Sequence, residues 1–169
     1  DQPPAIDATH IIRTLPGLSR DSHGAPLVAP ELVLIFKLPR EGAPKGSNVS
    51  VRGVTPASFE IRPYVKLVDG RMFRPGSNEL IVSRRVSRRF TGLHVGDSFV
   101  FGPQTWTIVG TYDAEGTAFD SEIWGDADYI MKARKRDAYS SVLVRPVDAA
   151  AMQQVEDSIR NDNRLKLEV

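Results

Sequence analysis

Residues 95–128, VGDSFVFGPQTWTIVGTYDAEGTAFDSEIWGDAD, decide how the middle of the chain folds. From Trp106 to Tyr112 every second position is apolar or glycine, and threonine fills most positions between them. A shorter alternation covers residues 98–101, and Gly102-Pro103 stands close to the point where the two runs meet. Strict alternation is typical of strands that bury one face, and glycine and proline mark turns. The stretch therefore predicts a β-hairpin.

The second half of this stretch gathers carboxylates around its glycines. They are Asp113, Glu115, Asp120, Glu122, Asp126 and Asp128. A glycosidase-type hydrolase using Glu115 and Glu122 needs two carboxylates ~5–10 Å apart, and nothing in the spacing predicts that distance. The triplet 126–128 lacks the further oxygen ligands and the distal glutamate of a calcium loop. We favour a hydrated connection in which Asp126 caps a helix.

A strand and a helix are predicted immediately upstream. ELIV (79–82) has strand composition, and Ser83 is placed to cap a helix over residues 84–93. Apolar residues recur there at helical spacing and predict an inward face. The outer face carries Arg84, Arg85, Arg88 and Arg89.

Helices and strands flank this region on both sides. On the N-terminal side we expect a helix over 1–15, a strand from Glu31, a loop or hairpin tip over 39–48, a strand from Val49 and short irregular strands over 55–78. On the C-terminal side we expect a short helix from Asp126, a strand over 139–146, a helix capped by Asp148 that buries Met152, Val155 and Ile159, and a strand over 164–169. This order predicts an α+β fold of two lobes. Residues 1–52 and 138–169 form a discontinuous α/β lobe, and residues 53–137 form an inserted β-rich lobe.

Composition excludes several classes of protein. The 169 residues carry a net charge of +1, which argues against a general nucleic-acid binder. The chain has no cysteine, so disulfides, thiolate nucleophiles and cysteine-ligated metal centres are excluded. Serine-hydrolase, dinucleotide and phosphate-loop motifs are absent from the sequence, and we expect no enzyme activity. The longest apolar run, Leu32 to Phe36, is too short to cross a bilayer, and the abrupt ends lead us to expect a piece of a longer protein.

Three passages carry a resemblance to a known family. VRGVTP precedes LVDGRMF, ELIVSRRVSRRFTGLHVGD joins a strand to a helix and a V-G-D turn, and WTIVGTY is an alternating strand. In this order they resemble the periplasmic core domain of MacB/FtsX-type ABC transporter permeases. The likeness covers nearly the whole chain, and it implies an α/β porter lobe with an inserted β-rich Sabre lobe.

The resemblance also implies a function. Such a domain lies outside the cytoplasmic membrane, between the first two membrane helices of an inner-membrane permease, and transmits ATP-driven movement to a substrate or partner. The implied partners are the permease's own membrane helices, a second permease copy, a separate cytoplasmic ATPase that uses the ATP, and a periplasmic adaptor or outer-membrane component. No cofactor is implied in the domain itself.

Two sets of residues follow from this interpretation. The resemblance assigns structural positions to Gly53, Gly70, Arg71, Gly96, Asp97 and Gly110. We expect the glycines to permit tight turns or close packing, and Arg71 to be buried or to bridge the lobes. Candidate partner-binding residues are Trp124, Glu122, Arg84 and Arg88. The alternative function is a small-molecule or glycan-binding module that uses a cleft between the lobes or around Trp106 and Trp124.

Overall fold

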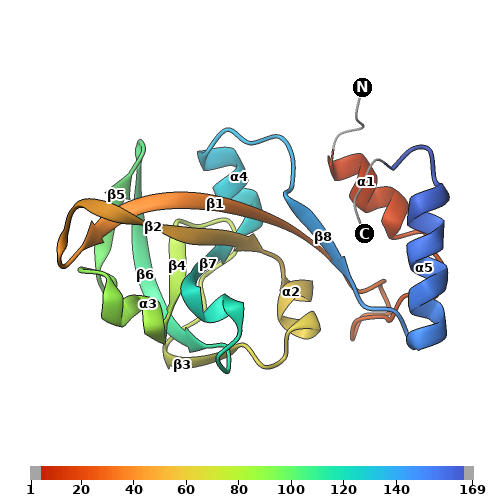
Figure 1. The fold of residues 1–169 in the computed structure, drawn as a ribbon, viewed down its shortest axis with the longest axis horizontal. Coiled ribbons are helices and arrows are strands. Elements are labelled where there is room, and N and C mark those ends of the chain that lie inside the picture. The colour runs from red at the N-terminus through yellow and green to blue at the C-terminus, as the bar shows by residue number, and fades with distance from the viewer. Residues whose placement is uncertain (1–4, 166–169) are drawn as a thin grey trace.

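One mixed sheet of eight strands runs through the computed structural model, which describes residues 5–165 (Figure 1). The strands are β1 (Val28–Arg40), β2 (Ala43–Val54), β3 (Lys66–Gly70), β4 (Glu79–Ser83), β5 (Ser98–Phe101), β6 (Gln104–Asp113), β7 (Glu122–Asp126) and β8 (Ser141–Val144). The helices are α1 (Ala5–Ile12), α2 (Pro56–Ile61), α3 (Arg84–Arg89), the short 3-10 helix η1 (Ala118–Ser121), α4 (Ala127–Ala133) and α5 (Ala149–Asn161).

The strand order is β3-β6-β4-β7-β2-β1-β8, and β5 also pairs with β6. β4 is parallel to β6 and β2 is parallel to β7, whereas the other neighbours are antiparallel. The expected α+β class is confirmed. The sheet is continuous through both predicted lobes, and the boundaries at 52/53 and 137/138 stay predictions.

β1 is the strand that joins the two ends of the molecule. Its first residues, Val28 to Glu31, pair with β8, and from Leu32 onward it pairs with β2. Figure 1 shows β1 running from the side of α1 and α5 to the opposite end, where it turns into β2. One strand therefore belongs to both ends.

Three groups of buried apolar side chains form the core. The largest surrounds Phe36 and Trp106, and a second surrounds Tyr112 and Trp124 on other residues of the same sheet. The third joins α1 and α5 to the start of β1, which explains why these helices from opposite ends of the chain lie side by side. Apolar burial of this kind is the main favourable contribution to folding.

Several predicted elements are confirmed. The hairpin consists of β5 and β6, which pair up to Phe101 and Gln104 around Gly102-Pro103. The Ser83 hydroxyl accepts a hydrogen bond from the backbone N–H of Val86 and begins α3. The side chains of Asp126 and Asp148 cap α4 and α5 in the same way.

Other predictions need correction. Residues 56–61 form α2, which was expected to be strand; Pro56 takes the first helical turn, where its missing N–H costs nothing. The segment 39–48, expected to be a loop or a hairpin tip, is a hairpin tip: β1 and β2 meet at a short turn after Arg40, and the two strands extend over most of the segment.

Met152 is 51% exposed, not buried, because α5 turns Ala151, Val155 and Ile159 inward instead. Residues 1–4 of the first predicted helix and 166–169 of the last predicted strand lie outside the described residues.

Candidate functional site: a buried ion-pair network on β1

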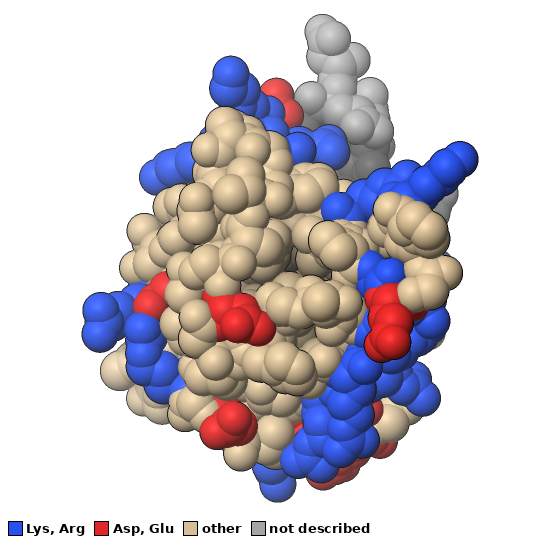
Figure 2. All heavy atoms as spheres, turned by 90° about the vertical axis from the view of Figure 1, so that its left-hand side faces the viewer, with Lys and Arg blue, Asp and Glu red and all other residues tan. Residues whose placement is uncertain are grey.

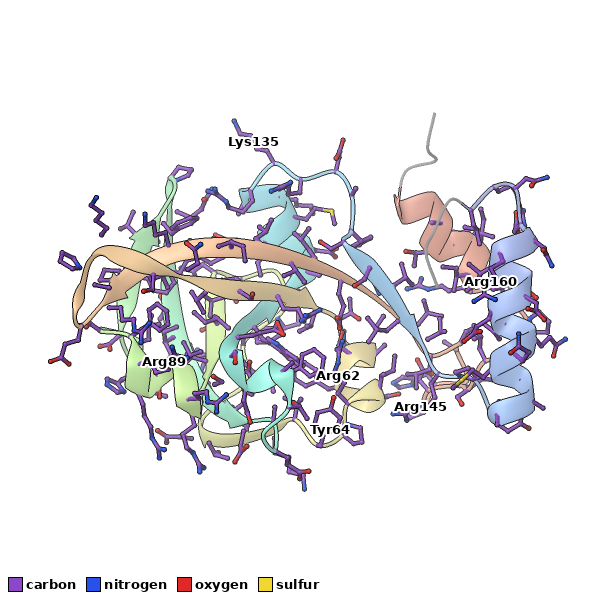
Figure 3. All side chains as sticks on the ribbon, in the orientation of Figure 1. Arg62, Tyr64, Arg89, Lys135, Arg145 and Arg160 are labelled. Atoms are coloured by element: carbon purple, nitrogen blue, oxygen red, sulfur yellow. The ribbon has the colours of Figure 1, made fainter. Side chains whose placement is uncertain are left out.

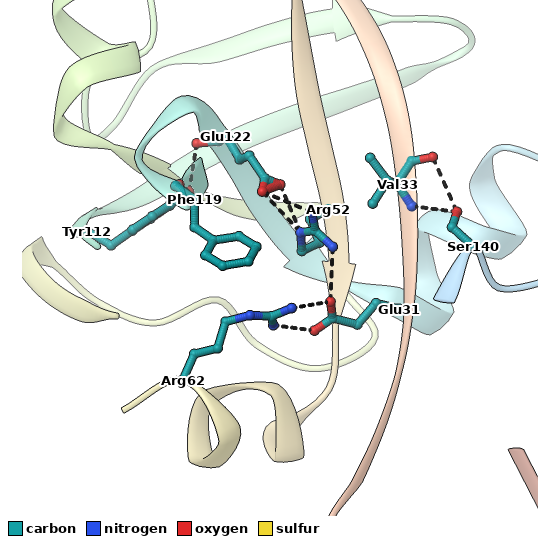
Figure 4. Close-up of polar contacts among 8 residues, drawn as sticks. All are labelled: Glu31, Val33, Arg52, Arg62, Tyr112, Phe119, Glu122 and Ser140. Carbon is teal, nitrogen blue, oxygen red and sulfur yellow. Dashed lines mark hydrogen bonds and ion pairs between the residues drawn. The ribbon is translucent and has the colours of Figure 1, made fainter. Parts of the chain in front are cut away.

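Glu31 occupies the position where β1 changes partners. It pairs with Ser141 at the end of the β8 ladder, and the next residue, Leu32, pairs with Gly53 of β2. The Glu31 side chain is 0% exposed. Its carboxylate accepts hydrogen bonds from Arg62 Nη1 at 2.6 Å and Nη2 at 2.9 Å, and from Arg52 Nη1 at 3.1 Å (Figure 4). A fully buried carboxylate is thus held by two guanidinium groups.

Arg52 connects Glu31 to a second buried carboxylate, Glu122 of β7. Arg52 Nε donates to Glu122 Oε2 at 2.8 Å, and its Nη2 donates to Oε1 at 3.1 Å. Burial raises the pKa of Glu122, while the hydrogen bonds and charge of Arg52 oppose that rise. Burial lowers the pKa of Arg52, but the hydrogen bond and charge of Glu122, with Glu31, raise it above its ordinary value.

Aromatic rings close the network on one side. The guanidinium carbon of Arg62 lies 4.3 Å from the centre of the Phe119 ring, and that of Arg52 lies 5.1 Å away. The Tyr112 hydroxyl lies 2.7 Å from the carbonyl oxygen of Phe119 and 2.8 Å from that of Glu122. Cations over aromatic faces are stabilised further when they are shielded from water.

Further contacts tie the neighbouring elements to this point. Ser140 Oγ accepts from the backbone N–H of Val33 at 2.9 Å, just before β8 begins. Arg145, just after β8, donates from Nη2 to the carbonyl oxygen of Ile61 at the end of α2 (Figure 3). The network and these contacts connect β1, β2, β7, β8 and α2.

The negative charges of the two carboxylates equal the positive charges of the two guanidinium groups in this network. Each charge has hydrogen-bonded partners, which is the condition under which burial of an ion pair is tolerated. Removing one partner leaves a buried charge uncompensated and costs about 3–5 kcal/mol. The arrangement holds segments together, and no carboxylate of the four-residue set is left free to act as an acid or base.

The six predicted carboxylates are dispersed over separate structural roles. Asp120 accepts from the backbone N–H groups of Ala114 and Gly116, and Asp113 accepts from that of Glu115. Glu115 is exposed, whereas Glu122 belongs to the network, so the two do not face a shared site. Within residues 5–165 no group of three acidic or histidine side chains is placed to hold a metal.

Two predicted partner-binding residues are buried, which is a correction. The Trp124 side chain is 0% exposed, because every second residue of β7 faces the core between Tyr112 and Phe59. Its Nε1 has no hydrogen-bond partner among the described residues. Glu122 is 5% exposed. Neither can meet a partner at the surface.

Arg84 and Arg88 do lie on the surface. They line a cavity of about 310 Å³ together with Arg85, Arg89 and two aspartates. Arg84 Nη1 is 3.9 Å from Asp113 Oδ2 in a loose ion pair. Figure 2 looks onto the end formed by the β1–β2 and β5–β6 turns and shows a mainly uncharged face with a few acidic side chains within it and Lys and Arg around much of its rim. Partner binding by Arg84 and Arg88 stays a prediction.

The residues assigned by resemblance lie at backbone contacts. A Cβ at Gly53 would lie 2.8 Å from Ala127 Cα, so glycine lets β2 approach α4. A Cβ at Gly70, whose φ is +71°, would lie 2.2 Å from the carbonyl oxygen of Val109, and one at Gly110 would meet the carbonyl oxygen of Arg71. Closely spaced backbones join β3 to β6 there.

Arg71 itself is exposed and pairs with Glu79, so the expected burial of Arg71 is wrong. Its side chain is 47% exposed. Asp97 and Gly96 form the turn before β5, where Asp97 Oδ2 accepts from the backbone N–H of His94 at 2.9 Å and Gly96 has φ +96°.

The sequence reasoning missed Glu31, Arg52 and Arg62. A signal existed for the first two: Glu31 heads the apolar strand ELVLIF, and Arg52 interrupts VSVRGV. A charged residue beside or within a strand rich in branched apolar residues implies a partner if the strand is buried. Nothing in the sequence indicated that Arg62, which lies in a segment predicted to be strand, belongs to the same ion-pair network.

Comparison with known proteins places the fold among permease domains. Structural similarity is found to the extracellular domain of the noncanonic ABC-type transporter YknZ from Gram-positive bacteria (16% identity, TM-score 0.67, covering 88% of this chain and 76% of that one). The periplasmic region of MacB from Actinobacillus actinomycetemcomitans is also similar (12% identity, TM-score 0.66, 94% and 72%). A domain of a putative permease protein from Porphyromonas gingivalis follows (14% identity, TM-score 0.56, 92% and 65%).

Three further findings bear on the chain's identity. No curated protein matches the sequence. No helix among the described residues has the length and apolar character required to cross a membrane. The model of the MacB-like periplasmic core domain matches residues 6–162. The chain therefore belongs to the MacB-like periplasmic core domain family.

Proposed function

We propose that this chain is the non-catalytic extracytoplasmic domain of an ABC-type permease and transmits ATP-driven movement of the membrane segments to a substrate or partner. The continuity of β1 carries the proposal. One strand is hydrogen-bonded to β8 beside the terminal helices and to β2 at the opposite end. Movement applied at α1 and α5 passes along that strand.

The ion-pair network supports the same function. Glu31 lies where β1 changes from one partner to the other, and Arg62 fastens α2 to the same carboxylate. Buried and fully paired charges fix one arrangement of the segments around them, because any displacement leaves a charge without its partner. A stiff joint at this position lets displacement reach the distal end.

The remaining partners follow from this function. α1 and α5 lie together at one end and would adjoin the membrane helices of the permease. A second permease copy completes the transporter, and a separate cytoplasmic ATPase binds the ATP, so this domain needs no cofactor. An adaptor or outer-membrane component would contact the opposite end. The transporter would be of the efflux type or of the type that exports lipoproteins or peptides.

Distances between two copies of the intact permease test the proposal. Two variants each carry one cysteine with a spin label, in place of Glu41 at the β1–β2 turn or of Gln154, which is exposed on α5. The domain has no cysteine of its own, so within the domain only the introduced position is labelled. In lipid nanodiscs with the ATPase, we expect ATP to change the label separation at both positions. A change at position 154 with none at position 41 would contradict transmission along the domain.

The alternative binding module loses its proposed platform. Trp106 and Trp124 are both 0% exposed, and Trp106 Nε1 donates to the carbonyl oxygen of Phe101 at 3.2 Å. Stacking of a sugar or flat ligand requires an accessible ring face. No observation at these residues favours that second function.

A further inference from the structure

A cavity of about 470 Å³ lies between the start of α2, residues 71–78 and the start of α4. Its walls are mainly apolar and include the rings of Phe59 and Phe73 and the side chain of Met72. A volume of roughly 300–1,000 Å³ with apolar walls and few polar groups is typical of small-molecule sites. The cavity is separate from the Arg84–Arg89 surface and from the ion-pair network.

Two aspartates give this cavity a negative side. Asp126 and Asp128 both line it, whereas no lysine or arginine of the described part of the chain does. The hydrogen bonds that Asp126 accepts from the backbone N–H groups of Tyr129 (3.0 Å) and Gly76 (3.2 Å) both end on Oδ2, which leaves Oδ1 with unused acceptor capacity. Asp128 is exposed at the same side.

Thr55 also lines the cavity, but its hydroxyl oxygen is enclosed where α2 begins and does not reach the cavity surface. The arginines of the adjoining segment, Arg71 and Arg74, do not line the cavity, and Arg71 pairs with Glu79.

We propose that this cavity binds a small apolar molecule that carries a cationic amine. The apolar body would contact Phe59, Phe73 and Met72, and the ammonium group would lie against the carboxylates of Asp126 and Asp128. The carboxylates attract a cation and repel an anion, and the aromatic rings also favour a cation. This inference does not depend on the proposed role in transmission.

Three probes with one apolar body test the charge preference. 4-Phenylbutylamine, 4-phenylbutanol and 4-phenylbutyrate are titrated into the chain, and binding is followed by the amide NMR shifts of Thr55, Phe59 and Asp126. We expect the amine to bind about five-fold or more tightly than the alcohol, and the carboxylate to bind most weakly. Equal affinity for the three probes, or no binding of the amine, would overturn the proposal.

Variants of the aspartates test the negative side directly. Asp126→Asn keeps the helix cap, because asparagine caps as well as aspartate, and Asp128→Asn removes an exposed charge. Each should weaken amine binding about three-fold and leave alcohol binding unchanged. The matched control is Glu41→Gln, which removes the same charge at the distal turn and should leave both affinities unchanged. Unchanged amine affinity in the Asp126→Asn/Asp128→Asn double variant would also overturn the proposal.

A substitution that fills the cavity tests whether the probes bind there. Met72 is 39% exposed, so Met72→Trp can place a larger ring in the cavity without entering the core. We expect it to abolish binding of all three probes while the unfolding midpoint stays near that of the parent chain. Val100→Trp, at a position 72% exposed on β5, is the control and should bind normally. Normal binding by a folded Met72→Trp chain would place the ligand elsewhere and end the proposal.

Discussion

The junction on β1 and the connection before β4 both pair arginine with glutamate, yet their surroundings differ. At the junction, Glu31 is 0% exposed and Arg62 is 5% exposed. In the connection, Arg71 is 47% exposed and binds Glu79 next to solvent. Buried charges are costly to leave unpaired, whereas exposed ones are hydrated when they separate. The same chemical pair therefore joins segments that are distant in the sequence in one region, and residues of a single surface connection in the other.

The largest expected effect comes from breaking the buried set. Arg62→Met removes both of its hydrogen bonds to Glu31, leaving only Arg52 as partner, and should lower the free energy of unfolding by about 3–5 kcal/mol. Urea unfolding followed by circular dichroism measures the change. Arg160→Met, at an exposed position on α5, is the control.

A second substitution checks the cause of that loss. Adding Glu31→Gln to Arg62→Met removes the uncompensated charge and should recover much of the stability. A loss below about 1 kcal/mol in the single variant would mean that burial does not distinguish the two regions.

Glu122→Gln should have an intermediate effect. The amide keeps the shape and an acceptor oxygen but loses the charge that Arg52 meets at 2.8 Å, and Arg52 retains Glu31. Removing the charge also removes the burial cost that raises the pKa of Glu122, so we expect a net loss of only about 1 kcal/mol in the same unfolding measurement. Glu115→Gln, at an exposed turn position, supplies the comparison, and equal losses in the two variants would contradict this reasoning.

The pH dependence of stability should have opposite signs in the two regions. The Arg71 hydrogen bond lowers the pKa of Glu79 from 4.5 to about 2, so its contribution is present above pH 4.5 and is lost as the pH falls toward about 2. Burial raises the pKa of Glu122, so its contribution is present below pH 4.5 and declines as the pH rises through its folded pKa.

Unfolding midpoints between pH 2 and pH 7 measure both effects. Relative to the parent chain, Glu79→Gln should show a shallower loss of stability below pH 4.5. Glu122→Gln should lose less stability as the pH rises above 4.5. Parallel profiles for all three chains would show that neither glutamate is shifted.

The smallest effect is expected at the arginine face. Arg84 is 47% exposed and its nitrogen is 3.9 Å from the Asp113 oxygen. Arg84→Ala should therefore change the free energy of unfolding by less than about 0.5 kcal/mol. A larger loss in urea unfolding would show that the exposed arginines of α3 support the fold as the buried Arg52 and Arg62 do.

Local sequence patterns correctly predicted the strands and helices whose formation depends on residues close together in the chain. The alternation around Trp106 gave the hairpin, and the caps Ser83, Asp126 and Asp148 began their helices where expected. These signals depend on neighbours a few residues apart. The short helix α2 was missed because its apolar residues suit a strand equally well, and only its position against β1 and β8 decides between them.

The candidate site was beyond sequence reasoning for a related cause. Glu31, Arg52 and Arg62 come together only through the pairing of β1 with β2 and the placement of α2. Trp124 looked accessible beside glycine and acidic residues, but β7 is an interior strand and the rings of Phe59 and Phe119 pack on the indole. Which charged side chains meet depends on the register in which β1 and β2 pair, and local sequence patterns do not reveal that register.

The tight β1–β2 turn has a consequence for how such domains diversify. β1 reaches Arg40 and β2 resumes at Ala43, at the end of the molecule farthest from α1 and α5. Inserted residues at a surface turn cost little chain entropy, and none would disturb Glu31 or the paired helices. Lengthening this tip would therefore let relatives extend the far end of the domain at little cost in stability, while α1, α5 and the ion-pair network keep their positions.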